Sequence, residues 1–335
     1  MRIFVCGCVH GSWERVVDEV NKLSREGTNI DLIIVAGDTE SFIDEEDLQS
    51  FPKPTGTQGL GTFKKLVNGE FKLPCKMLII GGNNEVGDRI FKLPFGGWIT
   101  PDIFFSGIAS QIYFGDLLIT CQSGIFNNDD YHTGLTETFP VRGEDKYRIV
   151  HIREFSIFQL YGLKRIPLFV SHDWPSGIPK KFSHVNKLSN LVDSDRKNQF
   201  GCPGFVKLIE KFHPNRWYAA HHHRRFDCNL GNGTKFFGVP RVIQQNLYVL
   251  QEINCEPGEF MYSGEWIDIL KKTEKYVKNP DILHHLNWDE EWKKIHSIKS
   301  DKIPKKVKVS EFKPEYQQQT YEFCNQHRIY NPYKM

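Results

Sequence analysis

The sequence has no apolar run that approaches the roughly 20 residues of a membrane-spanning helix. It also has little net charge, +2 over 335 residues, which excludes a uniformly basic coat for nucleic acid but not a local basic groove. No two of its eight cysteines form a Cys-x-x-Cys pair, and the first residues hold no secretory apolar region. We therefore expect reduced thiols in a soluble, intracellular protein that does not bind membranes.

Short apolar runs recur along the chain, and polar residues follow most of them directly. The runs cover 31–36, 77–80, 117–120, 167–170 and 217–220, after a first short strand at 2–6. Such continuous runs are typical of strands buried on both faces of an α/β sheet. Ligands of open α/β sheets bind beyond the carboxyl ends of the strands, so we expect the polar residues to converge on one site.

Two further features concern the organisation of the chain. Trp13, Val16, Val17, Val20 and Leu23 recur at the spacing of one helix face, which predicts a helix after the first strand. Past about residue 256 the composition changes: residues 271–308 hold eleven lysines and six acidic residues, so this segment carries +5 and the remainder −3. We predict a main domain over 1–255 and a smaller C-terminal domain over 256–335.

The polar residues at the predicted strand ends are metal-binding types. In chain order they are Cys8, His10, Asp38, Asn83, Asn84, His172, His221, His222 and His223. Imidazole nitrogens with carboxylate and amide oxygens suit a divalent transition metal, and a carboxylate can bridge two ions that clamp a phosphodiester. Taken singly, each histidine is an ordinary surface or core residue, and Gly37-Asp38 and Gly82-Asn83 are ordinary turns. Their joint pattern favours a metal site.

In this order the motifs resemble the calcineurin-like metallophosphoesterase signature. Cys8 replaces the first aspartate of that signature and Ala220 replaces the glycine before the last histidines. Both replacements resemble the RNA lariat debranching enzymes, a branch of that superfamily. Further blocks that resemble this branch lie at 93–98, 123–126, 171–175, 265–270 and 320–324, so the resemblance covers nearly the whole chain.

The resemblance implies an α/β/β/α sandwich with a smaller C-terminal domain, which hydrolyses the 2′–5′ phosphodiester at the branch point of excised lariat intron RNA. It implies one or two divalent ions, Fe²⁺, Zn²⁺ or Mn²⁺. One metal pocket would hold Asp38, Asn83, His172 and His221. The other would hold His10, Asp38 and His223 with Cys8 beside it, and Asp38 would bridge the two. A thiol in place of a carboxylate would soften or weaken that second pocket.

The same resemblance implies a lariat-recognition loop at about 123–153. Phe126 and Tyr131 would stack on unpaired bases. Phosphates would be met by Arg142, Lys146, Arg148 and Arg153. Asn127 stands where the family commonly has a lysine, so one phosphate contact is missing. Nuclear residence and contacts with spliceosome-associated proteins follow from the family's substrate.

Residue 84 departs from the family, which has histidine after the metal-binding Asn83. Near the leaving oxygen, an amide donates a hydrogen bond but has no proton to release. Cys8, His10 and Asn84 are therefore the candidate catalytic residues, and the proton of the leaving 2′ oxygen would come from His10, His222 or water. Three hypotheses follow: a slowed debranching enzyme, a branched-RNA-binding protein without turnover, or a phosphoesterase acting on another phosphodiester.

Overall fold

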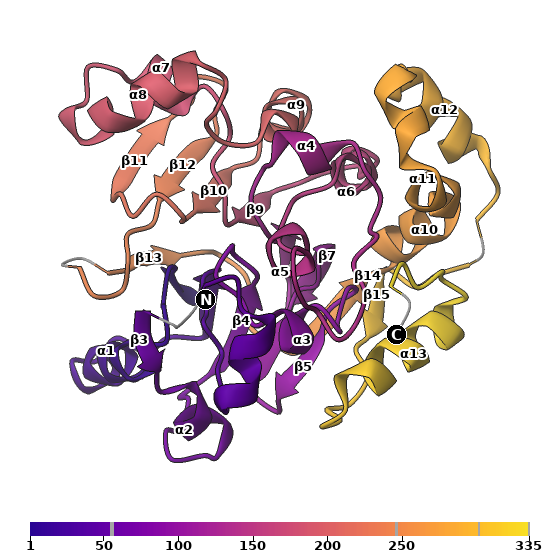
Figure 1. Ribbon diagram of the computed structural model, residues 1–335. Helices are drawn as coiled ribbons and strands as arrows, with labels where there is room; N and C mark the ends of the chain where they lie inside the picture. Colours follow the sequence, from indigo (N-terminus) through magenta and orange to yellow (C-terminus); the bar gives the residue numbers. More distant parts are fainter. Residues whose placement is uncertain (54–56, 245–246, 301, 334–335) are drawn as a thin grey trace.

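The computed structural model describes residues 1–53, 57–244, 247–300 and 302–333, and contains two β-sheets with helices on their outer faces (Figure 1). The first sheet has the order β13 (Val249–Glu252), β1 (Arg2–Cys6), β2 (Leu32–Ala36), β4 (Lys76–Ile80), β6 (Ile103–Phe105), β5 (Gly97–Thr100). The second has the order β11 (Phe226–Asn229), β12 (Lys235–Gly238), β10 (Arg216–Ala219), β9 (Leu168–Ser171), β8 (Leu117–Gln122), β7 (Ala109–Phe114), β14 (Phe260–Ser263), β15 (Lys306–Lys308). The predicted fold class is confirmed.

The apolar strands are buried on both faces, as predicted. Ile3 and Val5 of β1 face the core between the two sheets, while Phe4 faces the outer side. There Phe4 belongs to the same cluster as the buried face of α1 (Trp13–Arg25), the predicted first helix. This alternation follows from the two-residue period of a strand, and it explains why the runs are almost entirely apolar.

The remaining helices are short and connect or cover the strands. In the main part of the chain they are α2 (Phe63–Val67), α3 (Gly87–Ile90), α4 (Asn128–Tyr131), α5 (Asp145–Arg148), α6 (Glu154–Tyr161), α7 (Ile178–Lys181), α8 (Ser189–Arg196) and α9 (Pro203–Phe212). The short 3₁₀ helices η1 (Glu45–Ser50) and η2 (Asn186–Leu188) and the strand β3 (Thr57–Leu60) lie in the connections. α6 and α9 pack on the second sheet, where Phe205 of α9 contacts Phe169 and Trp217.

The C-terminal residues continue the second sheet. β14 pairs antiparallel with β7, and β15 pairs with β14 at the edge. The helices α10 (Gly264–Lys272), α11 (Glu274–Lys278), η3 (Pro280–His285), α12 (Trp288–Ser297) and α13 (Tyr316–His327) gather beside this edge (Figure 1). Trp288 and Trp292 pack on Phe158 of α6. Strands from both sides of residue 255 share this sheet. The predicted division into two domains at that residue remains a prediction.

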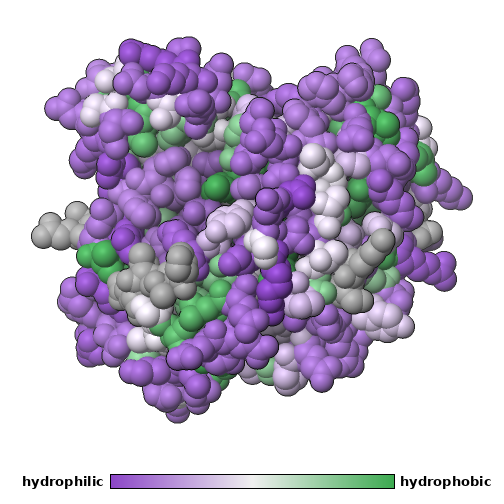
Figure 2. Space-filling model, in the orientation of Figure 1, coloured by the Kyte–Doolittle hydropathy of each residue, from purple (hydrophilic) through white to green (hydrophobic). Residues whose placement is uncertain are grey.

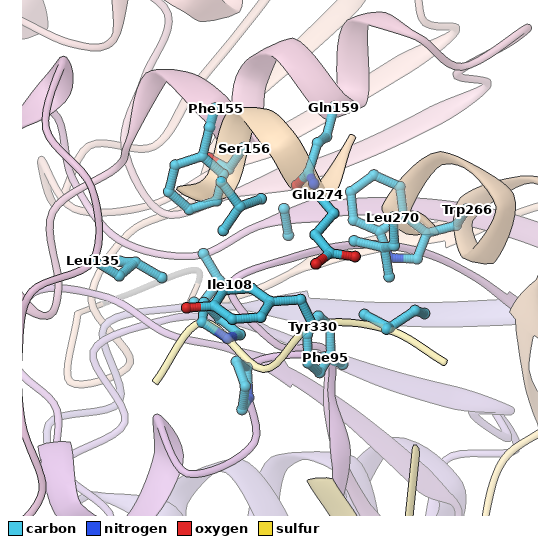
Figure 3. Close-up of a pocket in the computed structure, with 15 residues that line it drawn as sticks. Phe95, Ile108, Leu135, Phe155, Ser156, Gln159, Trp266, Leu270, Glu274 and Tyr330 are labelled. Carbon is cyan, nitrogen blue, oxygen red and sulfur yellow. The ribbon is translucent and has the colours of Figure 1, made fainter. Parts of the chain in front are cut away.

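A mostly apolar cavity marks the junction between the main part of the chain and these C-terminal helices (Figure 3). Phe95, Ile108 and Phe155 of the main part line it together with Trp266 and Tyr330 of the C-terminal part. On the outside, hydrophilic residues cover most of the face shown in Figure 2, and hydrophobic residues occur there in small groups. Among the described residues, no helix combines the length and apolarity needed to cross a bilayer.

Candidate metal centre

The polar residues at the predicted strand ends meet at one place in the structure. β2 pairs in parallel with β1 on one side and with β4 on the other. In the other sheet β9 and β10 also pair in parallel. Their carboxyl ends therefore lie at the same edge of each sheet, and the following loops deliver the side chains. The residues delivered are Cys8 and His10 after β1, Asp38 after β2, Asn83 and Asn84 after β4, His172 after β9, and His221 to His223 after β10.

Two groups of ligand atoms share the carboxylate of Asp38. Cys8, His10, Asp38 and His223 form one group, and Asp38, His172 and His221 form the other, with ligand atoms within 4.8 Å of one another in each. Oδ1 of Asp38 lies 3.2 Å from Nε2 of His172, while Oδ2 lies 3.5 Å from Nε2 of His10. The two oxygens thus face different groups, the arrangement that a bridging carboxylate requires.

Asn83 joins the second of these groups. Its Oδ1 lies 3.2 Å from Nε2 of His172, the nitrogen that also faces Asp38. In the first group, Nε2 of His10 lies 3.3 Å from Nε2 of His223. The family resemblance placed these residues in two pockets bridged by Asp38, and the structure brings their side chains close together around Asp38.

The imidazoles are oriented by hydrogen bonds on their far sides. Nδ1 of His172 lies 2.6 Å from the carbonyl oxygen of Ala36, which can only accept, so Nδ1 carries the proton and Nε2 presents a lone pair. Nδ1 of His10 lies 2.7 Å from Oε1 of the buried Glu40. A second partner of this kind fixes both the tautomer and the ring orientation of a metal-binding histidine.

The backbone around the centre is held in conformations that side chains rarely adopt. The angle φ is positive at Cys8 (51°), His10 (47°), Asp38 (53°), Glu40 (44°), His221 (60°) and His223 (54°). Such residues each cost about 1–3 kcal/mol and cluster at functional sites. Two glycines allow the loops to approach this closely: a Cβ at Gly82 would lie 2.3 Å from the Asp38 nitrogen, and one at Gly37 would lie 2.4 Å from Nδ1 of His172.

Asp38, His221 and His223 have the protonation states that metal binding requires. Burial opposes ionisation of Asp38, but the surrounding imidazoles, His172 foremost, hold its pKa well below the usual value. Burial lowers the pKa of His221 to about 3 and that of His223 to about 4. At neutral pH these two imidazoles are therefore uncharged, which is the form that binds a cation. Burial, together with the charge of Asp38, raises the pKa of the Cys8 thiol, so this group is a protonated thiol.

These residues fit a divalent transition metal. The centre offers imidazole nitrogens, one ionised carboxylate, an amide oxygen and a thiol, several of them on residues with positive φ. Zinc, iron and manganese accept such mixed nitrogen and oxygen ligands, and a thiol adds preference for the softer zinc or iron. The identity of the metal is not fixed by this ligand set.

Asn84 is hydrogen-bonded to the carboxylate of Asp38 through both its backbone and its side chain. Its backbone nitrogen donates to Oδ1 of Asp38 at 2.7 Å and its side-chain Nδ2 donates to Oδ2 at 2.8 Å. The side chain is buried, and among the described residues its Oδ1 has no hydrogen-bond partner. His222 faces away from Asp38: its ring stacks on Phe200, and its Nε2 lies 3.6 Å from Oδ1 of Asp173.

Two of the predicted RNA-binding residues, Arg153 and Tyr131, are buried in the structure. The side chain of Arg153 is fully buried, where its guanidinium is paired with Glu137 and donates to the carbonyl oxygen of His151. Tyr131 is 5% exposed, with its ring against Phe126. Both side chains belong to the interior of the segment 123–153, so neither reaches a phosphate or a base in this structure. Local sequence cannot show this, because burial depends on the packing of distant residues.

The other predicted RNA contacts remain at the surface. Phe126 is half-buried, and the side chain of Arg148 is 32% exposed and is paired with Asp130 at 2.9 Å. Arg142 is paired with Asp88, and Lys146 is half-buried. Asp173 links this segment to the metal centre, because its Oδ2 accepts from the Phe126 nitrogen at 2.9 Å while its Oδ1 faces His222.

Sequence reasoning overlooked Arg241. It follows β12, which is parallel to β10, so it emerges at the same edge as His221 and His223. Burial dominates the pKa values of Cys8 and His223, and the nearby charge of Arg241 lowers both. Its Nε is buried and has no hydrogen-bond partner among the described residues. The apolar run 236–239 before Pro240-Arg241 repeats the pattern that marked the other site residues and could have revealed it.

The fold and this centre are those of the calcineurin-like phosphoesterases. The model of the calcineurin-like phosphoesterase family matches residues 1–225, and the chain belongs to that family. It is similar to curated lariat debranching enzymes. Identity to the protein of Danio rerio is 29% over 316 residues, covering 86% of this chain and 56% of that protein. For Drosophila pseudoobscura pseudoobscura it is 34% over 337 residues, covering 85% and 63%.

A third relative, from Arabidopsis thaliana, matches more completely. Identity is 28% over 352 residues, covering 99% of this chain and 80% of that protein, which is also named lariat debranching enzyme. The chain spans little more than half the length of the proteins from Danio rerio and Homo sapiens, at 56% and 58%.

Proposed function

We propose that this protein hydrolyses the 2′–5′ phosphodiester at the branch point of lariat intron RNA. The observation that carries the proposal is the carboxylate of Asp38, whose two oxygens face two separate groups of ligands in a chain similar to lariat debranching enzymes. Hydrolysis would leave a linear RNA with a 5′-phosphate and a free 2′-hydroxyl at the former branch. The substrate also supports nuclear residence and contact with spliceosome-associated proteins as parts of this proposal.

The residues of the centre form two ligand groups, one for each proposed ion. Asp38, Asn83, His172 and His221 would hold one divalent ion, and His10, Asp38, His223 and the Cys8 thiol would hold a second, as Fe²⁺, Zn²⁺ or Mn²⁺. A bound divalent ion of this kind activates water and neutralises charge that develops on phosphate. The strained loops and the far-side hydrogen bonds of His172 and His10 keep the ligand atoms in place before substrate arrives.

Water is the proposed proton donor for the departing 2′ oxygen. Asn84 has no proton to release, and its side chain is engaged with Asp38. His10 lies between Asp38 and Glu40 as a member of one ligand group, and His222 faces Asp173. Because His10 contacts Asp38 and Glu40 and His222 lies against Asp173, a slow enzyme that depends on solvent is the form of the proposal that we favour.

RNA phosphates would meet a basic groove beside the centre. Lys187, Arg224 and Arg225 line a surface depression together with His223, and the charge of Arg241 acts on both His223 and Cys8. From the segment 123–153, Phe126 and Arg148 remain available for a base and a phosphate. A few local cations suffice for a small branch-point footprint, so the low net charge is compatible with this substrate.

The test incubates the full chain with a synthetic 2′–5′ branched RNA under anaerobic Fe²⁺, Zn²⁺ or Mn²⁺ and follows release of the branch. We expect cleavage of the branched RNA and none of a linear 3′–5′ RNA of the same composition. Tight binding of branched RNA without turnover would instead support the branched-RNA-binding hypothesis, which Asn84 favours. Cleavage of an aryl phosphodiester but not of branched RNA would indicate a phosphoesterase with another substrate.

A further inference from the structure

A second cluster of metal-ligating side chains lies outside the centre built on Asp38. His132 follows α4, Glu154 is the first residue of α6, and His284 lies in η3. One ligand atom from each lies within 4.8 Å of the others. None of the three belongs to the motifs that define the phosphoesterase family, and they come from parts of the chain about 150 residues apart.

The cluster combines a buried carboxylate with two accessible imidazoles. Nδ1 of His132 lies 2.6 Å from Oε2 of Glu154, and the ring centroids of His132 and His284 are 4.4 Å apart. The Glu154 side chain is 6% exposed, that of His132 is 42% exposed, and His284 lies at the surface. A cation entering from solvent would therefore meet the imidazoles first and rest on the carboxylate.

The three residues are held by well-packed elements. Phe158 of α6 contacts Tyr276 and Trp288 on either side of η3, with ring centroids 4.8 Å and 5.4 Å apart. Nε2 of Gln159, also in α6, donates to Oγ1 of Thr273 at 2.8 Å. A Cβ at Gly134 would lie 3.3 Å from Cγ of Pro280, so the loop after His132 also abuts the start of η3. The ligand positions are thus fixed by packing that does not need a metal.

We propose that His132, Glu154 and His284 form a zinc-binding site that joins the segment 123–153 to the C-terminal helices. Two imidazoles and one carboxylate with an open fourth position are a ligand set that zinc uses in proteins. Ligand atoms on a tetrahedral zinc ion lie about 3.3 Å apart, given bonds of about 2.0–2.1 Å. Zinc would replace the proton shared by His132 and Glu154, and small side-chain rotations would open their 2.6 Å contact to that distance.

The experiment counts zinc ions. The full chain is stripped of metal and equilibrated with Zn²⁺ alone, and unbound Zn²⁺ is removed. Bound zinc is then measured by elemental mass spectrometry. We expect the double variant His132→Ala/His284→Ala to bind one zinc ion fewer than the parent. The variant His172→Ala/His221→Ala is altered in the centre built on Asp38. It is expected to retain the zinc ion bound by His132, Glu154 and His284. His285→Ala is the matched control, because His285 is an exposed neighbour of His284 outside the cluster.

A second measurement separates loss of zinc from loss of the fold. Circular dichroism checks that each variant folds, and thermal unfolding with and without Zn²⁺ reports whether the ion links the two segments. Glu154→Gln keeps the size of the side chain and a hydrogen-bond acceptor for His132 but removes the charge, so we expect the zinc-dependent rise in unfolding temperature to shrink. An unchanged zinc count in a folded His132→Ala/His284→Ala variant would overturn the site. The outcome is independent of debranching activity.

Discussion

Asn84 donates two hydrogen bonds to Asp38, from its backbone nitrogen at 2.7 Å and from its side-chain Nδ2 at 2.8 Å. Each bond reaches a different oxygen of the carboxylate that the two ligand groups share. Residue 84 therefore holds the bridging carboxylate in place and offers no proton to a leaving group. Only the side-chain bond depends on the residue type, since every residue except proline supplies the backbone donor.

Asn84→His is expected to raise debranching of a branched RNA by about 10²-fold, because a positioned general acid contributes about 10²–10⁴-fold. Single-turnover rates of the two proteins, each loaded with the same metal, measure this. Asn84→Ala is the control for loss of the hydrogen bond to Asp38 and is expected to be no faster than the parent. If Asn84→His and the parent cleave at the same rate, residue 84 does not limit the reaction.

His172→Ala and His221→Ala are each expected to lose metal from the centre built on Asp38, and debranching activity with it. Both residues face Asp38 in one ligand group, and removing one imidazole leaves an incomplete set. Metal content is measured by elemental analysis and activity on branched RNA. His184→Ala, a change to an exposed histidine outside the centre, controls for the substitution itself. Full metal occupancy in either variant would show that the ligands are wrongly assigned.

Arg241→Gln is expected to slow debranching about 10²-fold without changing the metal content. A rate loss of this size is typical when one hydrogen-bond donor to the charge developing in the transition state is removed. The residue lies near Cys8 and His223, and its Nε is buried with no hydrogen-bond partner among the described residues. Rate and metal content are measured on the same preparation. Arg196→Gln, a change to an exposed residue of α8, is the control. A loss of metal in parallel with rate would mean that Arg241 shapes the centre instead of meeting phosphate.

Arg153→Ala is expected to destabilise the fold by about 3–5 kcal/mol, because it leaves the buried carboxylate of Glu137 without its partner. Arg148→Ala breaks a partly exposed pair with Asp130 and should cost about 1 kcal/mol or less. Urea unfolding at pH 7 measures both. A fully stable Arg153→Ala variant with weakened RNA binding would return Arg153 to the RNA-binding role that its sequence position suggests.

Glu291 is expected to make the stability depend on pH in the acid range. The hydrogen bond from Tyr276, with those from Lys294 and Lys275, lowers its pKa to about 2. A carboxyl group with a lowered pKa in the folded state contributes stability above its ordinary pKa, near 4.5, and loses it as the pH falls toward 2. Glu291→Gln should therefore differ most from the parent at neutral pH and least near pH 2.

Urea unfolding at several pH values between 7 and about 3 measures this difference. Glu290→Gln is the matched control, because Glu290 is the exposed neighbour of Glu291 in α12. A constant difference between the parent and Glu291→Gln across that range would show that the carboxylate of Glu291 gains nothing from its partners on folding.

The amphipathic and apolar patterns predicted much of the fold. The spacing from Trp13 to Leu23 predicted α1, and the apolar runs predicted β2, β4, β8, β9 and β10. Polar residues directly after those runs predicted which side chains would meet near Asp38. These inferences succeed because the period of a helix or strand and the position of a strand end are properties of neighbouring residues.

The segment 123–153 shows where that reasoning fails. Arg153 and Tyr131 look accessible in a polar stretch of sequence, yet Glu137 and the body of the protein enclose them. Arg241 looks unremarkable in sequence, yet the parallel pairing of β12 with β10 brings it to the metal centre. Neither outcome is encoded in local spacing, because both depend on which distant segments pack together.

The sequence by itself determined the strands formed by the apolar runs, the first helix and the set of residues that can bind a metal, because residue type and short-range spacing govern these features. Tertiary structure alone decided which oxygen of Asp38 faces which ligand group and that Asn84 is hydrogen-bonded to this carboxylate. It also decided that His132, Glu154 and His284 form a second cluster. Such contacts join residues far apart in the chain, and only the packing of two sheets and the C-terminal helices fixes their distances.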